Sequence, residues 1–146
     1  MSLTNEAENL LVLLLFQNAN WANIGDATGL RGSSAAGSFF ISLHTADPGE
    51  TGDQTTSEAT YTSYARVAVA RTSGGFTVSA DTASNAAAVN FPACTGGSST
   101  VTHFGIGTAS TAAGHLVGSG ALTASLAVSN GITPSFAIGA MTAVAA

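Results

Sequence analysis

The chain opens with a densely apolar run that has the length of a helix core. Residues 10–16 read LLVLLLF, and Glu6 and Glu8 precede them with no cation nearby. Ser2 or Thr4 can cap a helix at this point. The two acids would then stand in its first turn, where the helix dipole favours negative charge. The pattern predicts a helix over residues 4–18.

The apolar run fits neither a targeting segment nor a membrane span. A signal peptide begins with a positively charged region, and the residues before this run carry only acids. A membrane-spanning helix needs about 20 apolar residues, far more than this run supplies. We therefore interpret the run as a helix that is buried by protein.

Apolar residues lie on all sides of the predicted helix, so it must be covered on all sides. We expect Leu10 and Leu14 to face the helix's own domain, and the remaining apolar surface to meet a neighbouring subunit. The alternative is that the domain itself wraps the helix. The predicted subunit contacts are Leu11, Val12, Leu15, Phe16 and Trp21.

After residue 19 the pattern becomes one of short alternating segments separated by turns. Residues 20–37 form a Gly/Ser-rich loop, and residues 45–60 form a long polar loop that contains the turn signal Pro48-Gly49. Asn130-Gly131 is a hairpin signal. The alternation predicts strands at residues 38–44, 64–71, 76–78, 86–91, 100–108 and 116–128, with a strand pair or one bent strand in 132–146.

Seven or eight short strands at near-regular spacing after one helix are typical of a mainly β fold, a β-sandwich or jelly roll. The length of 146 residues fits one domain. We predict a single domain over 1–146, with the N-terminal helix in 1–19, the Gly/Ser loop in 20–37 and the β-sandwich in 38–146.

Charge is scarce in this sequence. Charged residues make up 8% of the chain, there is no lysine, and the formal net charge is −5; an average protein has about 25% charged residues. The cations Arg31, Arg66 and Arg71 are too few to neutralise a run of phosphates, so we expect no binding to nucleic acid or to an anionic membrane. A surface with so little charge is either built from small polar residues or covered by another protein.

Candidate catalytic and metal-ligating residues are few. His44, Asp47, His103 and His115 could form a metal or catalytic site only if the fold brings them together. Asp47, Glu50 and Asp53 could offer oxygens to calcium, although their spacing does not match an EF-hand and a solvated turn explains them more simply.

No known catalytic motif appears. Gly105-x-Gly107 lacks the third glycine and the helix of a dinucleotide site, and no nucleophile elbow is present. Cys94 is the one cysteine, so no intrachain disulfide or cysteine-based zinc site can form. We predict no catalytic residue, no cofactor and no metal.

Four stretches resemble a known family: LHTADPGE, YARVAVAR, FPACTGG and LAVSNGITPSFA, within a similarity that covers residues 8–146. The family consists of short β-rich structural proteins of tailed bacteriophages, often described as tail-fibre or tail proteins. The segments FFISLH and AIGAMTAVAA depart from its pattern. The resemblance implies a virion protein without enzymatic activity, made in the host bacterial cytoplasm.

The compact β pattern, without the long repeats of a fibre shaft, favours a capsid decoration or cement protein that binds the major capsid protein, together with homo-oligomerisation. The alternative is a tail or tail-fibre accessory protein for host attachment, bound to tail proteins. Such a protein would expose loop aromatics, for which Trp21, Tyr61 and Tyr64 are the candidates. A carbohydrate-binding jelly-roll module is a third hypothesis, which the single Trp disfavours.

Overall fold

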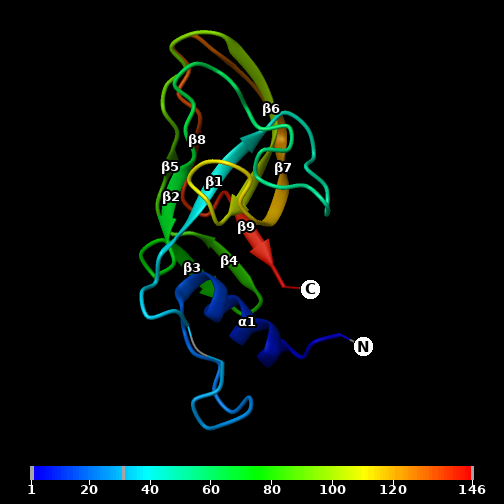
Figure 1. The fold of residues 1–146 in the computed structure, drawn as a ribbon, viewed down its shortest axis with the longest axis vertical. Coiled ribbons are helices and arrows are strands. Elements are labelled where there is room, and N and C mark those ends of the chain that lie inside the picture. Colours follow the sequence, from blue (N-terminus) through cyan, green and yellow to red (C-terminus); the bar gives the residue numbers. More distant parts are fainter. Residues whose placement is uncertain (1, 31, 146) are drawn as a thin grey trace. The chain divides into compact units, whose positions relative to one another are not determined.

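The computed structural model describes residues 2–30 and 32–145 and shows one helix and nine strands in them (Figure 1). Met1, Arg31 and Ala146, which some predictions above include, lie outside the described residues. The elements are α1 (Asn5–Gln17), β1 (Ser38–His44), β2 (Val67–Ala70), β3 (Phe76–Ser79), β4 (Thr82–Asn85), β5 (Val89–Asn90), β6 (Ser98–Gly107), β7 (Leu116–Ser129), β8 (Ser135–Phe136) and β9 (Thr142–Val144).

The predicted mainly β class with one N-terminal helix is confirmed. The strands form a four-stranded sheet in the order β2-β1-β6-β7, a three-stranded sheet β3-β4-β9 and a two-stranded sheet β5-β8, an arrangement consistent with a β-sandwich. The chain divides into two compact units. Unit 1 contains Met1–Ser38, Ala70–Ala88 and Ala137–Ala146, and unit 2 contains Phe39–Val69 and Val89–Phe136. The prediction of a single domain stays a prediction.

In unit 1, helix α1 packs against strands β3 and β4. The predicted N-cap is confirmed, because the Thr4 side chain accepts a hydrogen bond from the Ala7 amide at 3.3 Å. At the other end, the Arg71 guanidinium donates to the carbonyl oxygens of Leu14 at 2.8 Å and Leu15 at 2.5 Å. A cation at this position satisfies carbonyls that the helix leaves unpaired and complements the helix dipole.

The inward face of α1 differs from the prediction. Val12 and Phe16, four residues apart, are the buried positions, at 2% and 4% exposure, and the Phe16 ring packs edge-on against Phe76 at 5.0 Å. Leu10 and Leu14 are half-buried. The reason is size and spacing: the ring of Phe16 and the side chain one turn before it fill the space over the sheet.

No helix within the described residues is long and apolar enough to span a membrane.

Asn85, at the end of β4, fastens the C-terminal segment of unit 1. Its side-chain oxygen accepts from the Met141 amide at 2.9 Å, and its side-chain nitrogen donates to the carbonyls of Ala87 at 2.8 Å and Ala137 at 2.7 Å. The Asn85 residue is 1% exposed, and its bond to the Met141 amide is buried. No strand was predicted between the segments 76–78 and 86–91, but β3 and β9 pair with β4 on both sides and make residues 82–85 a strand.

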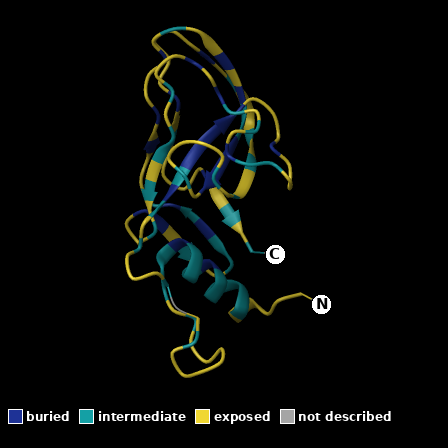
Figure 2. Cartoon of the chain, viewed as in Figure 1, coloured by how far each residue is buried: buried dark blue, intermediate teal, exposed yellow. Residues whose placement is uncertain are grey.

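In unit 2, the two-stranded sheet packs on the four-stranded sheet through aromatic rings. Phe104 of β6 and Phe136 of β8 lie 5.6 Å apart, and Phe91 adds a contact to Phe136 at 6.1 Å. Strand β1 is central, and Figure 2 shows most of its length as buried. The predicted strand at 64–71 shortens to β2, because Tyr64 and Arg66 hydrogen-bond with Glu58, and the predicted strand at 86–91 shortens to β5.

We expect Asn85→Ala to lower the free energy of unfolding by about 2–4 kcal/mol, because it removes three hydrogen bonds and leaves the buried Met141 amide without its partner. Urea denaturation followed by fluorescence measures this change. Asn90→Ala is the matched control, because Asn90 is exposed; its effect should stay within about 0.5 kcal/mol. Equal effects of the two substitutions would contradict the assigned role of Asn85.

Candidate functional site

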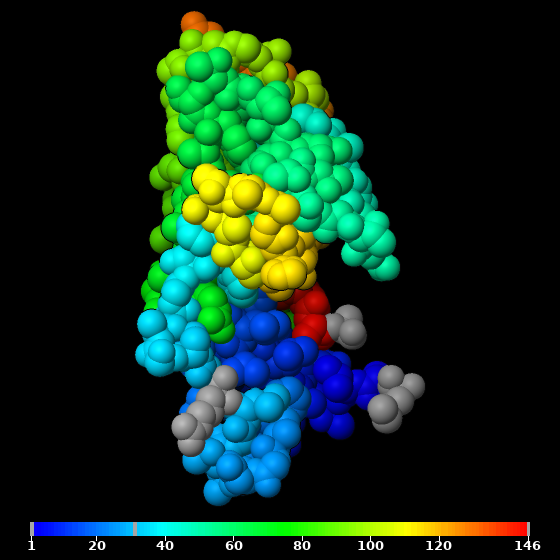
Figure 3. All heavy atoms as spheres, in the orientation of Figure 1, coloured from blue at the N-terminus to red at the C-terminus, as the bar shows by residue number. Residues whose placement is uncertain are grey.

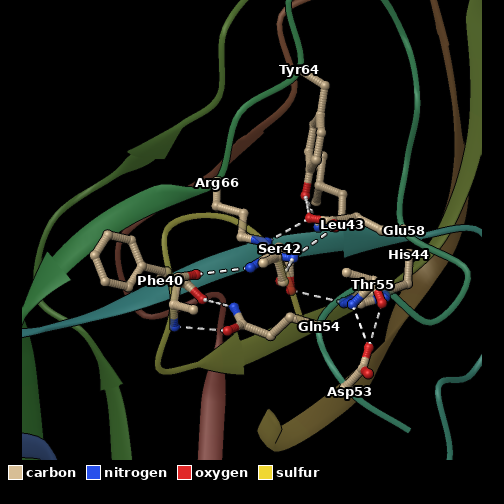
Figure 4. Close-up of polar contacts among 12 residues, drawn as sticks. Phe40, Ser42, Leu43, His44, Asp53, Gln54, Thr55, Glu58, Tyr64 and Arg66 are labelled. Carbon is tan, nitrogen blue, oxygen red and sulfur yellow. Dashed lines mark hydrogen bonds and ion pairs between the residues drawn. The ribbon is translucent and has the colours of Figure 1, made fainter. Parts of the chain in front are cut away.

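Strand β1 has one apolar face and one polar face, and both are buried. Phe39, Ile41 and Leu43 form the apolar face, while Ser42 and His44 on the other face are each 0% exposed. In the register with β6, Ser42 lies opposite Gly105 and His44 opposite His103. Cross-strand partners share one face of a sheet. A polar cluster forms on this face (Figure 4); it consists of Ser42, His44, Gln54, Glu58, Tyr64 and Arg66.

His44 links the sheet to the long loop 45–60. Its Nδ1 lies 2.8 Å from the carbonyl oxygen of Thr56, and its Nε2 lies 2.8 Å from the Ser42 hydroxyl. A carbonyl can only accept, so Nδ1 carries the proton and the Ser42 hydroxyl donates to Nε2. This arrangement requires a neutral imidazole. Burial lowers the pKa of His44 below its ordinary value, which keeps the ring neutral.

Gly105 and Gly107 make room for this cluster. A Cβ on Gly105 would lie 2.6 Å from His44 Nε2, and a Cβ on Gly107 would lie 2.0 Å from the side-chain carbon Cδ of Gln54. Any larger residue at either position would force buried atoms apart. The glycine pair that does not match a nucleotide fingerprint therefore leaves space on the sheet, which Ser42 and His44 of β1 and Gln54 of the loop fill.

Gln54 fills part of that space and is 0% exposed. Its side-chain nitrogen donates to the Phe40 carbonyl at 3.2 Å, and its side-chain oxygen accepts from the Ala109 amide at 2.8 Å. The backbone amide of Gln54 donates to the Ala113 carbonyl at 3.0 Å. One side chain thus joins β1, the loop 45–60 and the loop 108–115. Figure 3 shows these two loops side by side on the surface, in blue-green and yellow.

Glu58 and Arg66 form an ion pair that completes the cluster. The guanidinium donates through Nε at 2.6 Å and through a terminal nitrogen at 2.8 Å to the two carboxylate oxygens, and the Arg66 side chain is only 3% exposed. Arg66 also donates to the carbonyls of Ala109 and Ala112. The Tyr64 hydroxyl donates to Glu58 at 2.8 Å and accepts from the Leu43 amide; burial raises the pKa of Tyr64. Every charge in this pair therefore has hydrogen-bond partners.

The cluster contains a hydroxyl beside a neutral imidazole, the pairing that activates a serine in hydrolases. Here both Ser42 and His44 are fully buried, and the imidazole is held by a backbone carbonyl. No surface of the pair is open to a substrate. What the arrangement can do chemically is hold two loops on the sheet.

The structure brings His44 and His103 together and leaves His115 outside the cluster. His103 is the cross-strand partner of His44, and its Nδ1 lies 2.9 Å from the Thr102 hydroxyl. His115 precedes β7, and its amide donates to Thr108. Among the described residues, no group of three or more His, Cys, Asp or Glu side chains is placed to hold a metal ion.

The acids considered for calcium stabilise turns. Asp47 accepts from the Gly49 amide at 2.9 Å, and Asp53 accepts from the amide and the hydroxyl of Thr55 at 2.8 and 2.6 Å. The Thr55 hydrogen bonds hold the pKa of Asp53 below its ordinary value. Apart from the presence of the acids Asp47, Glu50 and Asp53 in one loop, no feature of the described residues favours cation binding there.

The predicted subunit contacts fall into two groups. Val12 and Phe16 are buried within their own chain, which is a correction: the helix presents them to its own sheet, so they offer no surface to a partner. Leu11, Leu15 and Trp21 are half-buried, which leaves part of each accessible; Trp21 is bridged to Leu30 through backbone hydrogen bonds.

The expected loop aromatics are also corrected in part. Tyr61 is 2% exposed and donates to the Pro92 carbonyl, and Tyr64 belongs to the polar cluster. Their rings pack edge-on at 5.3 Å, inside unit 2. Tyr61 is therefore no surface aromatic, whereas Trp21 and Tyr64 are both half-buried.

Sequence reasoning missed Ser42, Gln54, Glu58 and Arg66 as partners in one site. The available signal was the pair of polar residues Ser42 and His44, two positions apart in the apolar strand 38–44, followed on another strand by two glycines at the same spacing. Together these features indicate a buried polar face with room above it.

The chain belongs to a phage fibre family. A profile of the family described as "Podophage GP4 fiber I protein gp80" matches residues 3–144, almost the full length. This confirms the resemblance to structural proteins of tailed bacteriophages. No curated protein matches the chain.

We expect the stability of the protein to fall between pH 7 and pH 5 through His44. The unfolded chain binds a proton near pH 6.5, whereas the buried ring binds one only at lower pH. Below pH 6.5 the unfolded state therefore holds more protons, and stability is lost as the pH falls. The loss is up to about 2 kcal/mol by pH 5. The pKa values of Asp26 and Asp53 are also lowered, but these two residues change the stability only below about pH 3.8, outside this range.

His44→Asn tests this assignment, because the amide can still donate to the Thr56 carbonyl but cannot titrate. Urea unfolding at pH 7, 6 and 5 should show a smaller pH dependence for the variant than for the wild type. His44→Gln provides a second non-titrating variant if the first folds poorly. The same slope in wild type and variant would show that His44 is not the titrating group.

Proposed function

We propose that the protein is a non-enzymatic structural component of the tail of a tailed phage, assembled with its fibre. The observation that carries this proposal is the family match over residues 3–144. The family description names a fibre protein, so it supports the tail alternative better than a capsid decoration or cement protein. Its partners are then tail proteins, and the protein reaches the virion after synthesis in the host bacterial cytoplasm.

The internal chemistry supports a structural role. Among the described residues, polar side chains hold loops and one helix end in place. His44 and Arg66 fix the loops 45–60 and 108–115, and Arg71 caps α1. Both described arginines are engaged within the chain. The surface carries little positive charge for an anionic partner, in keeping with contacts to other proteins.

Stoichiometry and location in the virion test the proposal. Quantitative mass spectrometry of purified virions should give a copy number in the range of tail components, well below that of the major capsid protein. Gold-labelled antibodies against the protein should decorate tails in electron micrographs. Copies at the stoichiometry of the capsid lattice, with label on heads, would instead establish the decoration role.

Leu11 and Leu15 are proposed as contacts to a neighbouring virion protein. They lie four residues apart on one face of α1, which differs from the face of Val12 and Phe16 that packs on the chain's own sheet. Leu3, Ile24 and Leu30 are exposed apolar residues of the same unit. A partner that covers Leu11, Leu15 and Trp21 would remove this apolar surface from water.

The double substitution Leu11→Asp with Leu15→Asp should leave the protein folded and reduce its incorporation into virions. Phe16→Asp should instead unfold unit 1, because it places a charge against Phe76. Asn5→Asp is the control: it adds an acid at the exposed N-terminal end of α1, where the dipole favours it. Circular dichroism monitors folding, and mass spectrometry of virions monitors incorporation. Normal incorporation of a folded double variant would show that this face contacts no partner.

A further inference from the structure

Asn130 and Gly131 occupy the turn that follows β7 in unit 2. The Ile132 amide donates to the Ser129 carbonyl at 2.9 Å and closes this turn. Gly131 has a φ of +88°, a conformation that favours glycine. Asn130 is exposed, and a Cβ added to Gly131 would meet no atom within 4 Å. The Asn130 side chain is therefore in contact with solvent.

An asparagine followed by glycine is in the most reactive local sequence for loss of its side-chain amide. The backbone nitrogen of the next residue attacks the side-chain carbonyl carbon, and glycine obstructs this approach least because it has no Cβ. Of the asparagines in the sequence, only Asn130 precedes a glycine. The sequence therefore places the most labile asparagine of the chain at an exposed turn.

The fold engages the nitrogen that would attack. The Gly131 amide donates to the Cys94 carbonyl at 2.8 Å, a well-formed hydrogen bond, and the Cys94 amide donates to the Ile132 carbonyl at 2.9 Å. Cys94 is 1% exposed, so the acceptor lies on a well-packed segment of unit 2. Ring closure needs a Gly131 nitrogen that has given up its proton and moved toward the Asn130 side chain. The hydrogen bond to Cys94 must therefore break first.

We propose that Asn130 is a site of spontaneous deamidation, which the folded protein suppresses through the hydrogen bond from Gly131 to Cys94. When the turn opens, the Gly131 nitrogen loses its proton to solvent and bonds to the side-chain carbonyl carbon of Asn130, and ammonia leaves. Water then opens the cyclic imide to aspartate or isoaspartate. The reaction consumes water and releases ammonia, and it requires no oxidant or cofactor. The proposal does not depend on where in the virion the chain resides.

Deamidation changes a part of the chain that has no ionic side chain of its own apart from histidine. Every Asp, Glu, Lys and Arg of the sequence precedes residue 82. The product places a carboxylate at position 130, and isoaspartate also lengthens the backbone of the turn. Because water does not reverse the loss of ammonia, a chain whose turn has opened keeps a permanent change in charge and mass.

Mass spectrometry of peptic peptides measures deamidation at Asn130. The purified chain is incubated folded, and unfolded in urea, at the same mildly alkaline pH and temperature. The folded chain should react at least about 100-fold more slowly, because only its rare open state can react. In the control variant Asn130→Gln, ring closure is far slower, so its peptide should keep its mass in both states. Asn90, which is exposed and precedes Phe91, should react far more slowly in urea than Asn130.

Hydrogen exchange of the Gly131 amide, followed by NMR, tests the role of Cys94. Exchange and deamidation both need this nitrogen free, so folding should slow both by the same factor, within about threefold. Tyr61→Phe removes a hydrogen bond to the Pro92 carbonyl, near Cys94, and should change both rates equally. Three results would overturn the proposal: a folded chain that reacts as fast as the unfolded one, an unfolded chain in which Asn130 stays intact, or deamidation that does not follow exchange at Gly131.

Discussion

The hydrogen bond from the imidazole of His44 to the Thr56 carbonyl is the contact on which the organisation of unit 2 depends. It joins the end of strand β1, in the interior of the four-stranded sheet, to a loop that supplies Gln54 and Glu58 to the polar cluster. Because the imidazole is neutral and accepts from Ser42, the sheet can bury a polar face without burying a charge there. The charge that is buried nearby, on Arg66, has a bidentate carboxylate partner. Each polar group in the cluster is therefore satisfied by another part of the same unit.

Unit 1 solves a similar problem with different groups. An apolar helix lies on a small sheet, and its last carbonyls have no partners within the helix. Arg71, which follows β2, satisfies two of them, and Asn85 holds the C-terminal segment to β4. In both units, individual side chains with several donors or acceptors supply hydrogen bonds that the backbones of these short elements do not make with each other. This explains how a chain with so few charged residues keeps its loops in place.

Local features of the sequence predicted the elements well and their partners poorly. The helix, its Thr4 cap and the alternation in 100–108 follow from nearest-neighbour patterns, which the structure retains. The inward face of α1 could not be predicted, because every face is apolar and only the sheet beneath decides that Val12 and Phe16 point toward it. The polar cluster depends on residues separated by up to 55 positions, such as Gln54 and Ala109. β4 was missed because its strand character comes from two neighbours, and propensity alone favours a turn at that point.

The hydrogen bonds of the loop 45–60 also divide it into two parts that differ in how well they tolerate sequence changes. Its second half is fixed by Gln54, Thr56 and Glu58. Its tip, residues 47–52, has hydrogen bonds that are local to the tip, such as those from Gly49 to Asp47 and from Gly52 to Gly49. A change of length or sequence at the tip would therefore leave the sheet and its polar cluster intact. In a structural protein of a virion, this segment can diversify or accept an inserted peptide while the sheet and its polar cluster stay constant.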